Sequence, residues 1–155
     1  MQVISIVISG LEVVIAIAII LLGIFITIVR KGEIKEKGKR RRGTVILETD
    51  KGILLTAMKS KMFLLPGGGT NKGESRFRAA IRELEEETGL IANYAKIIFK
   101  YESNNNKHTV VLIKAKGIPK PRHEVKYIDF YKKGKKIKIS KGTKDIIEKY
   151  YKWKE

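Results

Sequence analysis

The first 29 residues constrain this chain most, because their pattern removes them from any soluble core. Val3–Val29 are almost all aliphatic, and Glu12 is the only charged side chain among them. An α-helix rises about 1.5 Å per residue, so about 20 apolar residues cross a hydrocarbon layer of about 30 Å. The pattern predicts a single transmembrane helix over residues 1–29. Glu12 would lie at its outer interface or deeper, against a partner helix.

A basic flank follows this segment. Residues Arg30–Arg42 include eight Lys or Arg side chains against only Glu33 and Glu36. Basic flanks stay on the cytoplasmic side, which predicts a single-pass protein with its N-terminus outside and the rest of the chain in the cytoplasm. The flank would also attract anionic lipid, or it is simply a stop-transfer signal and a solvated linker. A cleaved signal peptide is disfavoured, because the apolar run is long and no small-residue cleavage site follows it.

Charge and cysteine content limit the classes of function. The chain has 33 basic and 16 acidic residues, a net charge of +17, and the part from Gly43 onward is also strongly basic. This excess favours anionic partners: nucleotides, nucleic acid or the membrane surface. The chain has no cysteine, so disulfides, thiolate zinc sites and cysteine nucleophiles are excluded.

Residues 43–155 show the pattern of one α/β domain. Short β-branched runs bounded by turn residues predict strands, and apolar residues at helical spacing predict two helices. The order of strands and helices favours a mixed sheet covered by helices. The expected strands are Thr44–Glu48, Gly52–Met58, Met62–Leu65, Ala95–Tyr101, His108–Ala115, Val125–Tyr131 and Lys135–Ile139. The expected helices are Ser75–Thr88, ended by Gly89, and a last helix from Ser140 or Thr143 to about Trp153, with Ile146, Ile147, Tyr150 and Trp153 on one stripe.

The end of the first helix is acidic in an otherwise basic chain. Glu83, Glu86 and Glu87 stand at positions i, i+3 and i+4, which places their carboxylates on one helix face, while Glu85 points elsewhere. Negative charge at a helix C-terminus opposes the helix dipole, so a compensating partner is expected. Converging carboxylates suit a hard divalent cation such as Mg²⁺ or Mn²⁺, and Arg82 is spaced to hold Glu86. The alternative is a solvated glutamate-rich helix.

A glycine-rich loop precedes this helix. Pro66 is followed by Gly67, Gly68 and Gly69, a run that permits unusual backbone dihedrals or close approach of the backbone to a ligand. The free N–H groups of such a loop can bind phosphate oxygens. Loop and acidic helix together indicate a site for a phosphorylated ligand and a metal.

The spacing of these residues resembles the signature box of the Nudix hydrolase family. Gly68, five residues, Glu74, seven residues, Arg82-Glu83-Leu84, one residue, Glu86-Glu87, one residue, Gly89-Leu90 matches every position of that box, which spans Gly68–Leu90. The resemblance in element order covers about Gly43 to Trp153. The predicted transmembrane segment lies outside it.

The resemblance implies a Nudix-type α/β/α sandwich with a mixed sheet and an enzyme that cleaves the diphosphate bond of a nucleoside diphosphate linked to another group. It implies that Glu83, Glu86 and Glu87 bind Mg²⁺ or Mn²⁺, and that Arg82 orients the glutamates. Further implied roles fall to Glu74, which fixes the loop or the metal shell, and to Gly68 and Gly69, whose backbone approaches the metal site. The catalytic base varies within the family; Glu83 is one candidate here, and Glu124 and Glu102 are others outside the box.

The substrate is left open by the sequence. Family members that prefer ADP-ribose, dinucleoside polyphosphates or NADH carry additional marks after the box, and Ile91–Lys120 shows none of them clearly. Tyr94, Tyr101, Tyr127 and Phe130 are candidates for stacking on a base, or they belong to the core. An alternative function is a nucleotide- or RNA-binding module with little turnover, for which the basic excess is the argument.

Overall fold

The computed structural model describes residues 38–155. The predicted transmembrane helix, residues 1–29, and the first part of the basic flank lie outside the described residues. Among the residues that the structure describes, no helix is both long and apolar enough to cross a bilayer.

Two sheets form the centre of the domain. The first is mixed and has the strand order β4-β1-β6-β5, with β1 parallel to β6 and the other two pairs antiparallel. The second is antiparallel, in the order β2-β3-β7. The strands are β1 (Arg40–Ile46), β2 (Glu48–Thr49), β3 (Gly52–Ala57), β4 (Gly67–Gly69), β5 (Ile91–Glu102), β6 (Asn106–Lys116) and β7 (Tyr127–Tyr131); the helices are α2 (Arg76–Thr88) and α3 (Lys141–Lys154).

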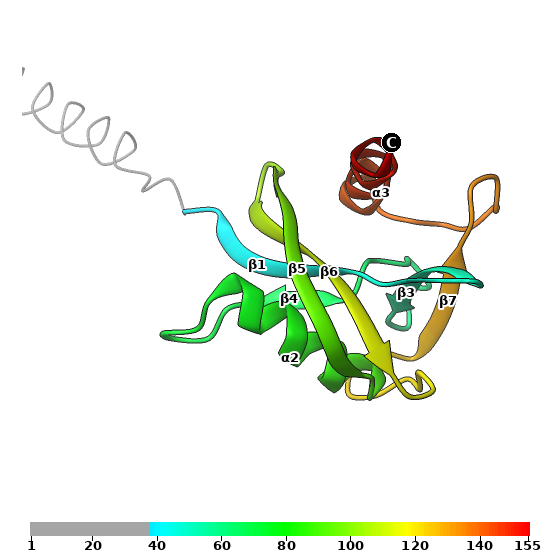
Figure 1. The fold of residues 1–155 in the computed structure, drawn as a ribbon, viewed down its shortest axis with the longest axis horizontal. Helices are drawn as coiled ribbons and strands as arrows, with labels where there is room; N and C mark the ends of the chain where they lie inside the picture. Colours follow the sequence, from blue (N-terminus) through cyan, green and yellow to red (C-terminus); the bar gives the residue numbers. More distant parts are fainter. Residues whose placement is uncertain (1–37) are drawn as a thin grey trace, which may run out of the picture. The chain divides into compact units, whose positions relative to one another are not determined.

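Side chains that alternate along the strands divide the core into two layers. Val45 packs in the layer that contains Leu84 of α2, whereas the next residue, Ile46, packs in the layer that contains Ile147 of α3. Successive strand residues point to opposite faces, so one strand supplies both layers. Figure 1 shows α2 on one side of the strands and α3 on the other. The predicted α/β/α sandwich with a mixed sheet is therefore confirmed.

Helix α2 has the boundaries that its sequence predicts. The Ser75 side chain accepts a hydrogen bond from the backbone N–H of Arg78, which caps the N-terminus. At the other end Gly89 takes the left-handed conformation, with φ of 71°, and its N–H bonds to the carbonyl of Glu85. The last turn of α2 holds no basic residue, so nothing in that turn offsets the unfavourable interaction between its glutamates and the helix dipole. Leu84 is fully buried and fixes which helix face turns outward.

The domain begins earlier than the sequence analysis expected. Strand β1 starts at Arg40, so Arg40–Arg42 belong to the sheet, although the basic-flank interpretation placed them in the linker. They pair in register with Asn106–His108 at the start of β6. The start of β1 is set by its pairing with β6, a parallel strand far along the chain, and the local basic composition does not predict that pairing.

Two predicted strands are wrong. Met62–Leu65 and Lys135–Ile139 contribute only isolated bridges, including one between Phe63 and Ile139. The strand in this region is β4, made of three glycines, because their backbone pairs with Arg42–Thr44 of β1. The predicted stripe of α3 is also incomplete: Trp153 is 42% exposed, at the C-terminal end of the helix.

Candidate active site

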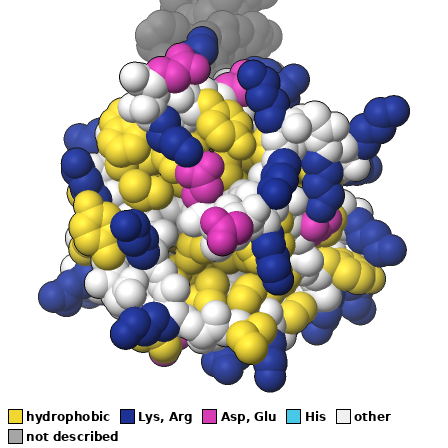
Figure 2. Space-filling view, turned by 45° about the vertical axis from the view of Figure 1, so that its right-hand side comes forward, with side chains coloured by type: hydrophobic (Ala, Val, Ile, Leu, Met, Phe, Trp, Pro, Cys, Tyr) yellow, Lys and Arg dark blue, Asp and Glu magenta, His cyan; other side chains and the backbone are white. Residues whose placement is uncertain are grey.

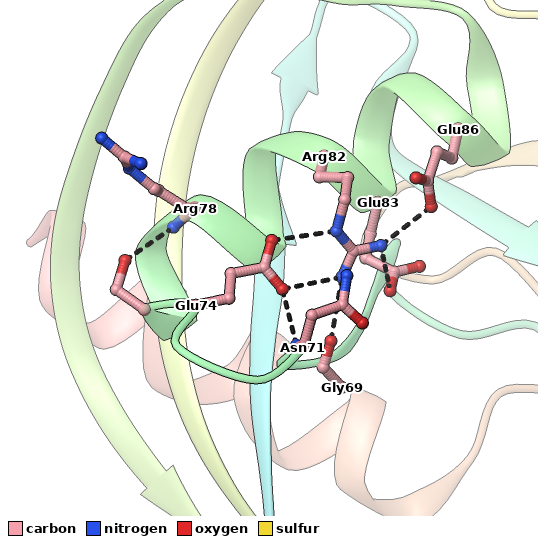
Figure 3. Close-up of polar contacts among 8 residues, drawn as sticks. Gly69, Asn71, Glu74, Arg78, Arg82, Glu83 and Glu86 are labelled. Atoms are coloured by element: carbon pink, nitrogen blue, oxygen red, sulfur yellow. Dashed lines mark hydrogen bonds and ion pairs between the residues drawn. The ribbon is translucent and has the colours of Figure 1, made fainter.

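Arg82 lies at the centre of a polar network on the outer face of α2 (Figure 3). Its guanidinium makes two hydrogen bonds to Glu74, at 2.9 and 3.1 Å, and one to the carbonyl of Gly69, at 3.0 Å. It also binds the carboxylates of Glu83, at 2.9 Å, and Glu86, at 2.8 Å. A planar fork with five N–H donors can make such contacts together, and a lysine cannot. Arg82 therefore ties the helix to the glycine-rich loop, as expected for a residue that orients the glutamates.

Glu74 connects the same network to the loop before α2. One of its carboxylate oxygens accepts a hydrogen bond from the backbone N–H of Asn71 at 2.8 Å. The hydrogen bonds from Arg82 and Asn71 lower the pKa of Glu74 below its ordinary value. This geometry places Glu74 as a support of the loop.

A cavity of about 280 Å³ opens beside this network, between α2, β3 and the glycines of β4. Two carboxylates of α2, those of Glu83 and Glu87, line it together with Gly67–Gly69. The side chain of Glu83 is 18% exposed and that of Glu86 is 44% exposed. Glu86 is turned to Arg82 and does not line the cavity. Of the three glutamates predicted to converge, the structure thus brings two into one cavity.

Glu87 is the most perturbed carboxyl group of the site. Burial, and then the nearby charge of Glu83, raise its pKa to about 7. The backbone of Gly67, the hydroxyl of Thr56 and the charge of Arg42 offset part of this shift. Two carboxylates in one partly buried cavity repel each other, and a cation between them would remove that repulsion.

This shift predicts how stability depends on pH. In buffer without divalent cations, Glu87→Gln should be more stable than the parent above pH 7, because ionising a buried carboxyl group costs free energy. The folded-state pKa is raised, so the advantage is absent below pH 4.5, grows as pH rises towards about 7, and reaches at most about 3 kcal/mol. Urea unfolding of both proteins across this range measures it. A pH-independent difference would contradict the assignment of the shift to Glu87.

The loop backbone approaches Glu83 closely at one glycine. A methyl group placed on Gly68 would lie 2.0 Å from a carboxylate oxygen of Glu83, whereas one placed on Gly69 would meet nothing within 4 Å. The predicted need for close backbone approach therefore has a steric basis at Gly68 and none at Gly69.

The donor set of the cavity fits a hard divalent cation in part. Glu83 and Glu87 supply carboxylate oxygens, the ligands that Mg²⁺ and Mn²⁺ prefer. Within residues 38–155, however, no group of three His, Asp, Cys or Glu side chains is already assembled to hold a metal. The bond from Arg82 to Glu86 accounts for the third carboxylate pointing away.

The two other candidate bases lie in different places. Glu124 lines the cavity together with Glu83, Glu87 and the glycines of β4. Glu102, at the end of β5, forms an ion pair with Lys39 and lines a separate pocket next to Asp145. The structure therefore brings Glu124 to the site and does not bring Glu102.

The candidate aromatic residues do not line this cavity. Tyr94 and Tyr127 are 46% and 40% exposed. Tyr101 donates a hydrogen bond to Asp145, and Phe130 packs against the core layer of α2.

Arg42 and Thr56 line the cavity and were not among the predicted site residues. Arg42 donates to the carbonyl of Gly67 at 2.7 Å, and the Thr56 hydroxyl donates to Glu87 at 3.2 Å. Nothing in the basic run distinguishes Arg42 from its neighbours. Only the pairing of β1 with β4 carries it to the site.

The chain is similar to known proteins in both sequence and fold. The profile of the NUDIX domain matches residues 38–146. An ADP-ribose pyrophosphatase from Methanocaldococcus jannaschii is 31% identical over 120 residues, which make up 70% of this chain and 71% of that protein. The structure of a Nudix hydrolase family member from Chromobacterium violaceum is similar with a TM-score of 0.70 and 35% identity, over 75% of this chain and 79% of the other.

A more distant structure shares the fold alone. It is a bifunctional NMN adenylyltransferase/ADP-ribose pyrophosphatase from Francisella tularensis, complexed with AMP and a Mn ion. The TM-score is 0.57 at 18% identity, over 76% of this chain and 42% of the other.

Proposed function

Because this chain belongs to the Nudix hydrolase family and is a Nudix pyrophosphohydrolase, we propose that it cleaves a nucleoside diphosphate–sugar of the ADP-ribose type in a reaction that depends on Mg²⁺ or Mn²⁺. The observation that carries the proposal is the pair of carboxylates, Glu83 and Glu87, that share one cavity with the glycines of β4. The Mn ion in the Francisella structure supports a divalent cation of this kind.

The residues in and beside the cavity have distinct roles in the proposed reaction. Glu83 and Glu87 would hold the cation, which would supply neutralisation of the diphosphate charge and activation of the attacking water. Glu86 adds negative charge next to them while bound to Arg82. Arg82 keeps the carboxylate of Glu83 in place, and Glu83 or Glu124 accepts a proton from the attacking water.

The positive charge of the chain favours an anionic substrate. Figure 2 shows Lys and Arg side chains, in dark blue, spread over one face of the domain, with few acidic side chains among them. Long-range attraction of this kind raises the association rate of nucleotides at low ionic strength. The same charge is the argument for the alternative, a nucleotide- or RNA-binding module with little turnover.

A turnover assay separates these alternatives. We expect Mg²⁺- or Mn²⁺-dependent release of AMP from ADP-ribose, measured beside nucleoside triphosphates, NADH, dinucleoside polyphosphates and capped RNA. Chelation with EDTA should abolish turnover, and added Mg²⁺ should restore it. Tight binding of these compounds without turnover in either metal would favour the binding module.

The membrane tether is a separate proposal. The apolar run Val3–Val29 and the basic residues that follow it support a single-pass anchor with the catalytic domain in the cytoplasm. We expect the full chain to sediment with membranes and to stay there after a carbonate wash. Release by carbonate, or digestion of the catalytic domain by protease added outside intact cells, would count against the anchor or its orientation.

A further inference from the structure

A second cavity, of about 300 Å³, adjoins the candidate active site. Arg42, Leu64 and Leu65 line both cavities and form the boundary between them. The second cavity also has His108 at the start of β6 and Ile146 of α3 in its wall, and we call it the His108 cavity. A substrate with its diphosphate beside Glu83 and Glu87 would extend its next group across this boundary.

His108 is held in a fixed orientation. Its Nδ1 lies 2.8 Å from the hydroxyl of Thr44, a residue that is 5% exposed. The ring of Tyr101 packs on it with centroids 5.6 Å apart, and Asp145 in turn accepts a hydrogen bond from the Tyr101 hydroxyl at 2.7 Å. One ring nitrogen is therefore committed to the protein and the ring is supported from the side.

The second ring nitrogen of His108 is available to a ligand. Residues 38–155 provide Nε2 with no hydrogen-bond partner, and they contain no buried side-chain nitrogen or oxygen that lacks one. Nε2 is therefore not fully buried, and His108 is one of the residues that line the cavity. Burial, and then the charge of Arg42, lower the pKa of His108 to about 4, so the ring is neutral at physiological pH.

The chemistry of the cavity fits a neutral ring with hydrogen-bonding groups. Leu64, Leu65 and Ile146 supply apolar wall, while His108 and Asn106 are neutral polar residues of the lining. Pockets for small ligands typically combine apolar walls with a few placed polar groups in this way. Among residues 38–155, the only cation in the wall of this cavity is Arg42, which donates a hydrogen bond to the carbonyl of Gly67 and has further N–H donors.

We propose that the His108 cavity binds the nucleoside part of the substrate, with a hydrogen bond from that part to His108 Nε2, and that Arg42 contacts the adjoining phosphate. The proposal rests on the proposed function, since it assumes a nucleotide diphosphate in the first cavity. His108 would then act in specificity and substrate binding, while the cation site performs the chemistry.

The test compares nucleotides with a ligand that has no nucleoside. AMP, GMP, CMP, UMP and inorganic phosphate are titrated calorimetrically into the full chain in detergent with Mg²⁺. At least one nucleotide should bind at least about tenfold more tightly than inorganic phosphate. His108→Asn should lower the affinity for that nucleotide by about 3- to 10-fold, which corresponds to the loss of one hydrogen bond. It should change the affinity for inorganic phosphate by less than about twofold. Arg42→Met should lower the affinity for both the nucleotide and inorganic phosphate.

His108→Asn suits the test because the Asn side chain can still reach Thr44 but has no group at the position of Nε2. His123→Asn is the matched control; His123 has φ of 52°, which Asn tolerates, and it does not line the cavity. If thermal unfolding shows that His108→Asn is not folded, Asn106→Ala, compared with Asn105→Ala, replaces it and should show the same selective loss.

Two results would overturn the proposal: no nucleotide binds more tightly than inorganic phosphate, or the variant loses phosphate and nucleotide binding equally. Turnover of ADP-ribose is measured in parallel, so failure of the proposed function is recognised separately. Absent turnover with intact nucleotide preference contradicts the hydrolase, and intact turnover without that preference contradicts the nucleoside subsite.

Discussion

Glu83→Gln should lower kcat by about 10²-fold or more while the domain stays folded. Glu83 is the carboxylate that both lines the cavity and bonds to Arg82, so the substitution removes a charged ligand without changing side-chain size. The negative charge of Glu83 holds the cation, which is needed most as negative charge develops on the diphosphate in the transition state. The substitution should therefore lower kcat more than it changes substrate binding. Steady-state kinetics on ADP-ribose, or on whichever diphosphate is the best substrate, measure it.

The matched control is Glu85→Gln, which makes the same change in the same helix turn. Glu85 is exposed and does not line the cavity, so its kcat should stay within about twofold of the parent value. Added Mg²⁺ should raise the melting temperature of the parent and of Glu85→Gln more than that of Glu83→Gln, since a ligand that binds only the native state stabilises it more when it binds more tightly. Equal stabilisation of all three proteins would exclude Glu83 from the metal site.

Gly68→Ala should lose activity while keeping most of its stability. The added methyl group would lie 2.0 Å from the Glu83 carboxylate, so that carboxylate must move. The atom in conflict is the end of a flexible side chain, and we expect a change in unfolding free energy of only about 1 kcal/mol. A displacement of about 1 Å at a catalytic group can cost about 10²-fold in rate. Turnover and urea unfolding of the same preparation test both parts.

The neighbouring glycines provide two controls for this experiment. Gly69→Ala adds the same methyl group where the structure leaves open space, and its activity should fall much less. Gly67→Ala should instead destabilise the fold, because Gly67 has φ of 139° and its methyl group would lie 2.2 Å from the carbonyl of Gly43. Similar activity in Gly68→Ala and Gly69→Ala would falsify the steric argument.

The sequence alone determined the parts of this protein that depend on local spacing. Helix α2, its Ser75 cap and its Gly89 end follow from residues within a few positions of one another, and the structure confirms them. The contact of Arg82 with Glu86 was also predictable, because the two residues stand at i and i+4 on the helix. The short β-branched and aliphatic runs of β1 and β3 also predicted strands, and both strands supply side chains to the two core layers.

Only the tertiary structure decided which of these groups meet. Arg40–Arg42 look like linker residues in the sequence, yet pairing with β6 and β4 makes them a strand and brings Arg42 to the cavity. The same long-range pairing sets Thr44 beside His108 and makes a strand of three glycines, which have no strand preference of their own. Helix spacing allows Glu86 either to converge with Glu83 and Glu87 or to bind Arg82, and in the structure it binds Arg82 and lies outside the cavity. Contacts between residues far apart in sequence depend on strand pairing and packing, and the spacing of residues along the chain does not predict them.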